Sequence, residues 1–510
     1  MNGPTHSSRM GDVARVAPRM GDALPGFATF VALVGTAVQN GGFFPGSWTA
    51  VTVGFLWLIA IALLLGVELE LTTAELAWLG LLAAVAAWTA LSVSWSLNAR
   101  ESVFEVRRDL VYVSAAAAIL LLGMRRSAAH VLSAVWGAAG VVVVYALAKY
   151  LLAHELRSDQ FQVNLLFRPL GYANALGIFA GLGAVLAVAL AARAATPLLR
   201  SLAAASLAPF AAAISLTASR ASALAVVVGL AVMVLLDRRR LDLVGVGIVV
   251  APLVAAVVAL CERADLTTPA RGPGVEGRAH ILALWIVGGA AVLAWAPRVA
   301  DAVPRYLTRR DRRLLVAAAV TAACVIATAA VAGRHRIDAF FTTGYRPAYW
   351  HVAWKEAAAH PALGAGAGAF ADYWSRYGDP NLAGGALDAH NLYLETLAEL
   401  GVVGLVLLAA ALSLPLLVAL RHRTSPLAAP AAGAYAAFLA HAVVDWDWEM
   451  PTVTIAALAC AAAVLLLERE TAHVRTLSAP ARGALLIVAL ALAIGVLAAQ
   501  FVPGLERPYP

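Results

Sequence analysis

The chain has 510 residues, of which 62% are hydrophobic and only 13% are charged, and its mean hydropathy is +0.81. Soluble domains carry about 45–50% apolar and about 25% charged residues, so this composition excludes a soluble globular protein. The formal net charge of +7 is compatible with nucleic-acid binding, but the arginines stand in short clusters between apolar segments and do not cover one folded domain. We therefore expect an integral membrane protein whose partners include membrane lipid and exclude nucleic acid.

Apolar segments recur along the whole chain, and most are long enough to cross a hydrocarbon core of ~30 Å. We predict about fifteen spans, near residues 27–40, 48–66, 75–95, 110–123, 129–152, 170–192, 197–216, 221–236, 242–261, 280–296, 313–333, 400–420, 427–444, 451–467 and 483–502. Residues 1–23 are polar and basic and lack the pattern of a cleavable signal peptide, which predicts a disordered cytoplasmic tail. Cys261, Cys324 and Cys460 lie in or beside spans and predict no disulfide framework.

The arginine clusters predict the orientation of the spans, because positive residues near span ends remain on the cytoplasmic side. With the amino terminus inside, the clusters near residues 125–126, 238–240, 298–313 and 421–423 are cytoplasmic, and the long polar segment 344–399 is outside. The predicted fold is an all-α polytopic membrane protein with about 12–15 transmembrane helices and one long extracytoplasmic loop. Its predicted parts are the tail (1–23), a transmembrane bundle (24–333), an extracytoplasmic catalytic loop (334–399) and C-terminal transmembrane helices (400–510).

Three arginines, Arg168, Arg220 and Arg346, are predicted at the outer ends of spans. Arginines in such positions often extend toward lipid headgroups, which requires no further function. Arg168 and Arg220, however, lie on the side where arginine is disfavoured, among small residues that allow helices to pack closely. Since a guanidinium group binds phosphate oxygens in a bidentate manner and stays charged, we favour a phosphate-binding role.

His390 lies just before an amphipathic segment that leads into the next span. If Asp388 is the helix N-cap, His390 occupies the first turn, where the helix dipole disfavours imidazolium and keeps the ring neutral, as a general base requires. The alternative is a surface histidine without a role. Glu395 and Glu399 share one face of this helix; they could orient His390 or a sugar, but we favour a solvated face.

Two further patterns carry weaker signals. Gly364, Gly366 and Gly368 resemble a phosphate-binding loop, but the lysine of a P-loop and a preceding strand are missing, which favours a tight turn. Asp445 and Asp447 have the Asp-x-Asp spacing that many glycosyltransferases use for a divalent ion, but no histidine or second acidic cluster completes a site by sequence. We predict neither a metal ion nor another cofactor.

In this order, the polar segments resemble the O-antigen ligase and polymerase superfamily of bacterial membrane glycosyltransferases, over about residues 160–460. The matching positions are Arg168, Gly171 and Asn174 at the start of a span; Thr217, Ser219 and Arg220 between two spans; Arg346, Trp350, Pro361, Gly364, Gly366, Phe370, His390, Asn391, Glu395, Glu399 and Gly401 in and after the long loop; and Asp445 in the last external segment. The chain departs from the family pattern in its extra hydrophobic segments and in Ala175, where a second asparagine is common.

The resemblance implies a GT-C-like enzyme of the bacterial plasma membrane. Such an enzyme transfers a glycan from a polyprenyl diphosphate carrier, such as undecaprenyl diphosphate, to a hydroxyl of a glycan, lipid or protein acceptor at the outer face. By resemblance, Arg168, Arg220 and Arg346 bind the diphosphate, His390 is the base, and Asn174, Asn391, Glu395 and Asp445 support them without a metal ion. The alternative is a transporter or flippase that moves the same lipid-linked glycan without forming a bond. Ligase and repeat-unit polymerase differ only in the acceptor, which the sequence does not identify.

Overall fold

The computed structural model describes residues 20–67, 69–152, 162–268, 274–301, 344–380, 382 and 386–501. Within these ranges the fold is almost entirely helical, and the described sheet consists of β1 (Glu70–Leu71) paired antiparallel with β2 (Arg475–Thr476). The described α-helices are α1 (Met20–Ala37), α2 (Pro45–Leu64), α3 (Thr73–Ser92), α4 (Ala99–Leu121), α5 (Ser127–Leu152), α6 (Ala173–Arg193), α7 (Pro197–Leu216), α8 (Arg220–Leu236), α9 (Arg240–Ala264), α10 (Val275–Leu293), α11 (Ala296–Ala300), α14 (Arg346–Ala359), α15 (Phe370–Tyr377), α16 (Leu392–Arg421), α17 (Ala428–His441), α18 (Pro451–Leu466) and α19 (Ala479–Ala498).

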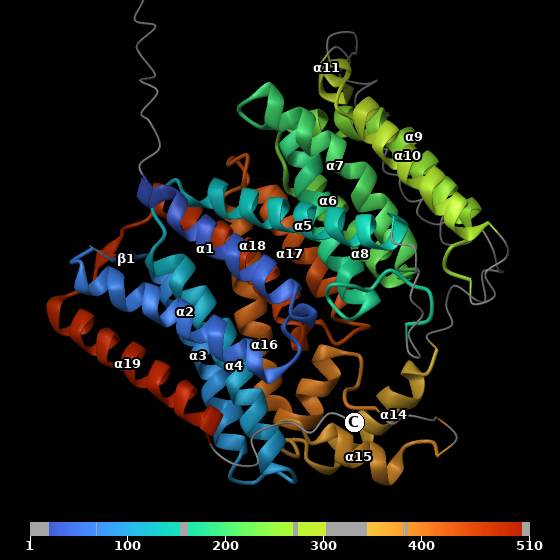
Figure 1. Cartoon of the computed structure of the whole chain (residues 1–510). Helices are drawn as coiled ribbons and strands as arrows, with labels where there is room; N and C mark the ends of the chain where they lie inside the picture. The colour runs from blue at the N-terminus through green and yellow to red at the C-terminus, as the bar shows by residue number, and fades with distance from the viewer. Residues whose placement is uncertain are drawn as a thin grey trace, which may run out of the picture.

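Among the described helices, 10 are long and apolar enough to cross a membrane, and α1 and α8 are shorter apolar helices. Every predicted span coincides with one described helix, except the span at 313–333, which lies outside the described residues. The prediction of an all-α, multi-pass membrane protein is therefore confirmed. The helices α9 and α10 lie at one edge of the bundle and α19 lies at the other edge (Figure 1).

The helix α4 is longer than the span predicted near residues 110–123, because it begins about three turns earlier, at Ala99. Asn98 caps this helix by accepting a hydrogen bond from the backbone N–H of Glu101. The first turns carry charged side chains that the sequence pattern places outside a span. The structure buries Arg108, which forms ion pairs with Glu105 and Glu449. Charges that are paired inside the protein therefore extend the buried part of the helix beyond its apolar segment.

The helix α18 is the centre of the bundle, since all of its residues are buried. It packs against α1, α4, α5, α16 and α17. Small residues allow close helix crossings around this centre. At the crossing of α8 and α17, a Cβ atom on Gly229 would lie 2.6 Å from the backbone oxygen of Gly433. Such contacts are typical of membrane helices, where close packing supplies the association energy that the hydrophobic effect does not.

A smaller layer lies at one end of the bundle and contains α14, α15 and the beginning of α16 (Figure 1). Its own apolar core includes Val352, Phe370, Tyr373 and Trp374. The helix α16 links this layer to the bundle and is kinked at Gly401, whose φ is 67°. The long polar segment thus folds onto the bundle as a compact unit that brings its side chains toward the ends of α6, α8 and α17.

Candidate functional site

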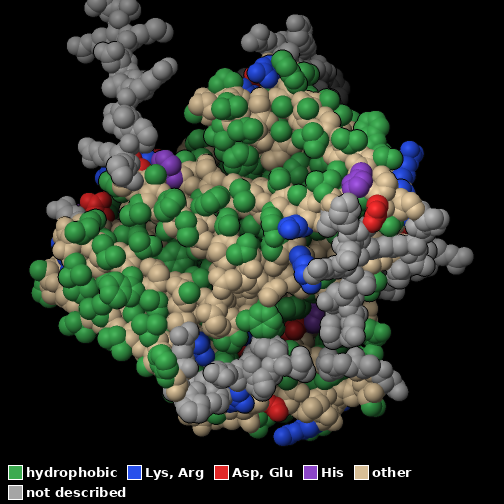
Figure 2. Space-filling view, viewed as in Figure 1, with side chains coloured by type: hydrophobic (Ala, Val, Ile, Leu, Met, Phe, Trp, Pro, Cys, Tyr) green, Lys and Arg blue, Asp and Glu red, His purple; other side chains and the backbone are tan. Residues whose placement is uncertain are grey.

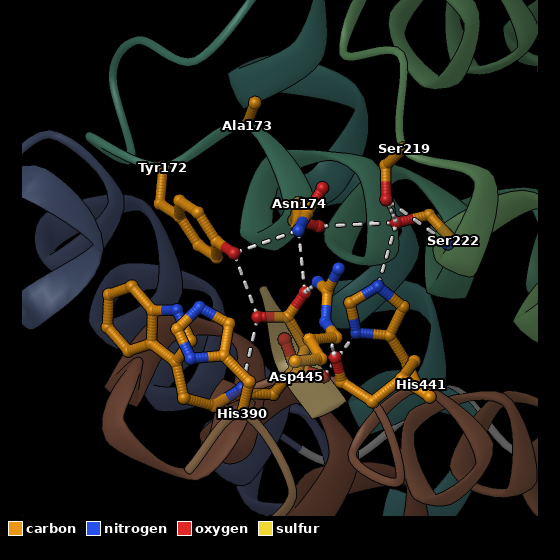
Figure 3. A network of polar contacts seen from close by, with 12 residues as sticks. Tyr172, Ala173, Asn174, Ser219, Ser222, His390, His441 and Asp445 are labelled. Atoms are coloured by element: carbon orange, nitrogen blue, oxygen red, sulfur yellow. Dashed lines mark hydrogen bonds and ion pairs between the residues drawn. The ribbon is translucent and has the colours of Figure 1, made fainter. Parts of the chain in front are cut away.

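Asp445 is the centre of a hydrogen-bond network at the end of the bundle next to this layer (Figure 3). Its side chain is completely buried. Oδ1 accepts hydrogen bonds from the Tyr172 hydroxyl (2.9 Å) and the Trp446 backbone N–H (3.0 Å). Oδ2 accepts hydrogen bonds from Asn174 Nδ2 (2.6 Å) and Arg346 Nη2 (2.9 Å). Four donors thus satisfy a carboxylate that would be costly to bury alone.

The partners of Asp445 come from segments far apart in the sequence. Tyr172 and Asn174 lie at the N-terminus of α6, and Arg346 is the first residue of α14. Arg346 also donates from Nε to the backbone oxygen of Val444, at 2.5 Å, which fixes the guanidinium against the segment that carries Asp445. Although burial disfavours the ionised form of Asp445, nearby cationic groups, Arg346 among them, hold its pKa below the usual value. The structure therefore brings together three predicted site residues, Asn174, Arg346 and Asp445.

His390 adjoins this network through aromatic rings. Its ring lies 5.1 Å from the Tyr349 ring and 6.4 Å from the Trp446 ring, measured between centroids. Its Nδ1 lies 2.6 Å from Asp388 Oδ1, and its side chain is 22% exposed. The same Asp388 oxygen accepts a hydrogen bond from the His390 backbone N–H, at 2.9 Å. A carboxylate thus lies against one nitrogen of the imidazole, as it does in many histidine bases.

The predicted position of His390 in the helix is wrong. The N-cap of α16 is Asn391, whose side chain accepts hydrogen bonds from the backbone N–H groups of Tyr393 and Leu394, and the helix begins at Leu392. His390 precedes the cap, with φ at 51° in the left-handed region. Burial lowers the pKa of His390, but the carboxylates of Asp388 and Asp445 together raise it to about 9. The expectation that a helix dipole keeps this ring neutral is therefore also wrong.

Glu395 and Glu399 do not form a solvated face, contrary to the prediction. Glu399 is buried and accepts hydrogen bonds from the backbone N–H groups of Gly368 (2.8 Å) and Phe370 (3.0 Å). Glu395 accepts a hydrogen bond from the backbone N–H of Ala389, at 2.9 Å, next to His390. Both glutamates therefore hold loop segments, near Gly368 and Ala389, against α16, a contact that helical periodicity alone does not reveal.

The glycine-rich segment forms turns, as predicted. Gly364, Gly366 and Gly368 all have positive φ. At Gly364 a Cβ atom would lie 2.1 Å from the backbone oxygen of Glu399. Gly364 therefore packs closely against α16, whereas Gly366 and Gly368 pack against Ser96 and Glu101 at the beginning of α4. This close packing explains the repeated glycines.

A cavity of about 60 Å³ lies behind Trp446, between α3, α4 and the first turns of α16. Its lining includes Arg108 and the carboxyl groups of Glu395, Glu399 and Glu449. The volume is sufficient for a few water molecules. Trp446 separates this polar interior from Tyr172, whose ring lies 4.6 Å from that of Trp446.

Arg168 and Arg220 are exposed. Arg168 precedes α6 and lies over the Phe167 ring, with 5.5 Å between its guanidinium carbon and the ring centroid. Arg220 is the first residue of α8, whose N-cap is Ser219. In Figure 2, basic side chains lie beside a recess in which acidic and histidine side chains are visible at depth. Arg168 and Arg220 are thus exposed at the end of the bundle where α6 and α8 begin.

The two aspartates of the Asp-x-Asp pattern have separate partners. Asp445 binds Arg346, whereas Asp447 forms an ion pair with His441 Nδ1. Among the described residues, no group of three His, Cys, Asp or Glu side chains is arranged to hold a metal ion. Each aspartate of the pattern thus pairs with a side chain of a different helix, Asp445 with α14 and Asp447 with α17.

Sequence reasoning missed several members of the site. Tyr172, His441 and Ser222 were not assigned roles, although Tyr172 lies between two residues of a recognised motif, and Asp388 was assigned only as a helix N-cap. Ser222 Oγ lies 3.1 Å from His441 Nε2, so Ser222, His441 and Asp447 form a connected series. The chain positions of these three residues gave no signal, because they are brought together only by the packing of α8 against α17.

Together these features define a polytopic membrane protein with a polar site at one end of its helices, assembled from both halves of the chain. Residues 202–409 match the family model described as O-antigen ligase. This match supports the O-antigen ligase and polymerase superfamily and, in general terms, a glycosyltransferase of the ligase or polymerase type. It includes Arg220, Arg346 and His390, whereas Asn174 and Asp445 lie outside the matched residues. No curated protein matches the chain.

Proposed function

We propose that this protein transfers a glycan from a polyprenyl diphosphate carrier to an acceptor hydroxyl during assembly of a bacterial cell-surface polysaccharide. The observation that carries the proposal is the convergence of Asn174, Arg346, Asp445 and His390 at one edge of a membrane bundle. A lipid-linked donor requires a site at that edge, because its carrier remains in the membrane while its glycan and diphosphate are in water. The O-antigen ligase match over residues 202–409 supports the same class of reaction.

In the proposed step, the acceptor oxygen attacks the anomeric carbon of the donor sugar as the bond from that carbon to the diphosphate oxygen breaks. The acceptor proton passes to His390 Nε2, and the bonding electrons leave with the polyprenyl diphosphate. Attack from the side opposite the leaving group inverts the configuration at the anomeric carbon. Cations near the departing diphosphate lower the barrier, since negative charge grows on it in the transition state.

Arg168 and Arg220 are the proposed diphosphate ligands, because both are exposed beside the network. Arg346 is the third proposed diphosphate ligand. Its contacts with Asp445 and Val444 support a structural role as well. It fixes the Asp445 segment between α6 and α14. A guanidinium can bind two partners at once, because its five N–H donors point in fixed directions.

His390 is the proposed base, and Asp388 is its orienting partner. The contact of 2.6 Å between Nδ1 and the Asp388 carboxylate leaves Nε2 as the nitrogen that meets the acceptor hydroxyl. Because the pKa of His390 is raised to about 9, the base form is a minority species near neutral pH and grows as the pH rises. Asn391 and Glu395 support this arrangement by capping α16 and by binding the backbone of Ala389.

The remaining parts of the proposal concern location and cofactors. We place the amino terminus in the cytoplasm and the α14–α15 layer outside, because arginine clusters resist translocation. The reaction is proposed to need no metal ion, since guanidinium and imidazolium groups supply the positive charge. Ligase and polymerase activities use the same step and differ in the acceptor.

The test is transfer by the purified full-length protein in detergent, with a polyprenyl-diphosphate-linked oligosaccharide, a glycan acceptor and a strong chelator. A transferase forms product under these conditions, whereas a flippase forms none, because it makes no bond and has no bilayer to cross. Product that appears only after addition of Mg²⁺ or Mn²⁺ would contradict metal independence. Absence of product with any acceptor, together with glycan translocation in liposomes, would favour the flippase.

A further inference from the structure

A second network of buried polar side chains lies beside Asp445, and the proposed reaction does not use it. It consists of Ser219, Ser222, His441 and Asp447, and we refer to these four residues as the relay (Figure 3 labels the first three). Ser219 Oγ lies 2.7 Å from Ser222 Oγ, and Ser222 Oγ lies 3.1 Å from His441 Nε2. His441 Nδ1 is in turn paired with Asp447 Oδ2.

Ser222 is not a nucleophile that a substrate can reach. Ser222 and His441 are both 0% exposed, and Asp447 is 1% exposed. A Cβ atom on the neighbouring Gly177 would lie 2.7 Å from Ser222 Oγ, so α6 covers the hydroxyl closely. The order of contacts is that of a Ser–His–Asp triad, but burial on every side assigns it a different task.

His441 contacts two members of the relay through its two ring nitrogens. Ser222 Oγ donates to the backbone oxygen of Asn174 at 3.3 Å, because a carbonyl oxygen only accepts. Nε2 of His441 faces the Ser222 hydroxyl and Nδ1 faces the Asp447 carboxylate, so the ring is held on both sides.

The relay ends at groups of the proposed donor site. Ser219 is the N-cap of α8, accepting a hydrogen bond from the backbone N–H of Ser222, and Arg220 is the first residue of that helix. Asn174, which Ser222 contacts through its backbone, donates to Asp445 through its side chain. The relay therefore connects the beginning of α8 to the beginning of α6 and to the Asp445 segment.

We infer that His441 is a positioning residue, which acts through Ser222 and Ser219 to hold Arg220 at the orientation that binds the donor diphosphate. This inference rests on the proposed function. His441 also pairs with Asp447, whereas Arg346 pairs with Asp445. Fixing the first turn of α8 lowers the entropy that is lost when Arg220 binds an anion.

The test measures the dissociation constant of undecaprenyl diphosphate, the leaving product, for the full-length protein purified in detergent. The probe is independent of the unknown glycan and acceptor. His441→Gln retains an amide donor near the position of Nε2 and keeps the contact with Ser222. His441→Asn retains a donor near Nδ1 and loses that contact. We expect His441→Asn to weaken binding by about tenfold and His441→Gln by much less.

Ser222→Ala provides a second variant, in case substitution of a buried histidine prevents folding. It removes one hydroxyl and is expected to weaken binding as His441→Asn does, whereas the control Ser206→Ala, on α7, leaves it unchanged. Equal effects of the Gln and Asn variants, or unchanged binding by Ser222→Ala, would overturn the relay. Melting temperatures of the variants show whether the comparison is made between folded proteins.

A double variant separates the relay from the proposed function itself. Arg220→Ala should weaken diphosphate binding on the order of tenfold to a hundredfold, and adding His441→Asn should weaken it no further, because the residue to be positioned is gone. If the losses of binding from Arg220→Ala and His441→Asn add up, His441 does not act through Arg220. The assignment of Arg220 to the diphosphate site would still hold. If Arg220→Ala binds as the wild type does, the diphosphate assignment fails and the relay has no ligand to serve.

Discussion

Two buried arginine–carboxylate pairs lie at opposite ends of α18, and they differ in how completely they are enclosed. At the C-terminal end, Arg469 pairs with Glu75, with side-chain exposures of 1% and 0%. At the N-terminal end, Arg346 pairs with Asp445, with side-chain exposures of 23% and 0%. The helix between them has 16 residues, which corresponds to about 24 Å at ~1.5 Å per residue.

Arg469 and Glu75 are hydrogen-bonded to each other and to backbone groups of the protein. Arg469 donates from Nε to Glu75 (2.7 Å), from Nη2 to the backbone oxygen of Leu120 (2.8 Å) and from Nη1 to that of Gly123. Glu75 also accepts from the backbone N–H of Thr72 in a capping box that begins α3. Every group has a partner inside the fold, so the pair joins α3, α4 and the end of α18 and has no surface to offer a ligand.

The Asp445 pair joins helices as well, but its cation reaches water and its neighbours include His390, with a raised pKa and a partly exposed ring. The comparison teaches that a buried ion pair alone does not indicate a functional site. The distinguishing features are a partly exposed cation, a titratable group beside it and aromatic rings around both.

The largest expected difference is in catalysis. His390→Ala should reduce the rate of transfer by ~10²–10⁴-fold, the usual contribution of a general base, while polyprenyl diphosphate still binds. Product formation and donor binding by purified variants measure the two effects, with His422→Ala, at the C-cap of α16, as the control. Transfer by His390→Ala at the wild-type rate would show that another group removes the proton.

Loss of the carboxylate charge should mainly reduce stability at the Arg469 pair and mainly reduce transfer at the Arg346 pair. Glu75→Gln leaves Arg469 buried without a counter-charge and should lower the free energy of unfolding by about 3–5 kcal/mol. Asp445→Asn should cost only about 1–2 kcal/mol, because Arg346 can turn to water, but should reduce transfer about tenfold or more.

Thermal unfolding in detergent and transfer assays on the same preparations measure both quantities. A large loss of stability in Asp445→Asn with normal transfer per folded molecule would make the two pairs equivalent.

The pH dependence should reveal the contact between His390 and Asp388. Because the pKa of His390 is raised to about 9, kcat/KM should increase by about tenfold per pH unit below that value as the ring loses its proton. Asp388→Asn removes the negative charge, so the rise of kcat/KM should move to lower pH. The maximum kcat/KM should also fall, because the His390 ring is less well oriented. A profile unchanged by Asp388→Asn would remove Asp388 from the proposed mechanism.

The smallest expected effect concerns Glu356 on α14, which is fully buried and whose carboxyl oxygens have no hydrogen-bond partner among the residues that the structure describes. Burial and the nearby charges of Glu399 and Asp372 raise the pKa of Glu356. The folded state therefore keeps a proton that the unfolded chain releases above about pH 4.5, and stability decreases as the pH rises from there toward the raised pKa.

Glu356→Gln imitates the protonated acid and should raise the melting temperature at pH 8 by a few degrees, with little change near pH 4.5. The exposed Glu276→Gln is the control. A melting temperature of Glu356→Gln that is unchanged at both pH values would show that the α14–α15 layer does not unfold with the bundle or that Glu356 is ionised.

The sequence by itself determined the class of the protein, because apolar length and the scarcity of charge leave only membrane-spanning helices as a way to satisfy the backbone. Each predicted span whose residues are described corresponds to a helix. The order of polar motifs also indicated the family that the match over residues 202–409 supports. These properties are local or compositional, so they can be read along the chain.

The tertiary structure decided what each polar residue contacts. Asn391 caps α16 in place of Asp388, which instead contacts His390 and raises its pKa. Glu399 lies on a helix face that periodicity predicts to be solvated, but the Gly364–Gly368 turns cover it. Such pairings depend on which helix ends meet, and those are set by packing between residues hundreds of positions apart. Exposure, pKa and hydrogen-bond partner all follow from that packing, so the sequence alone does not determine them.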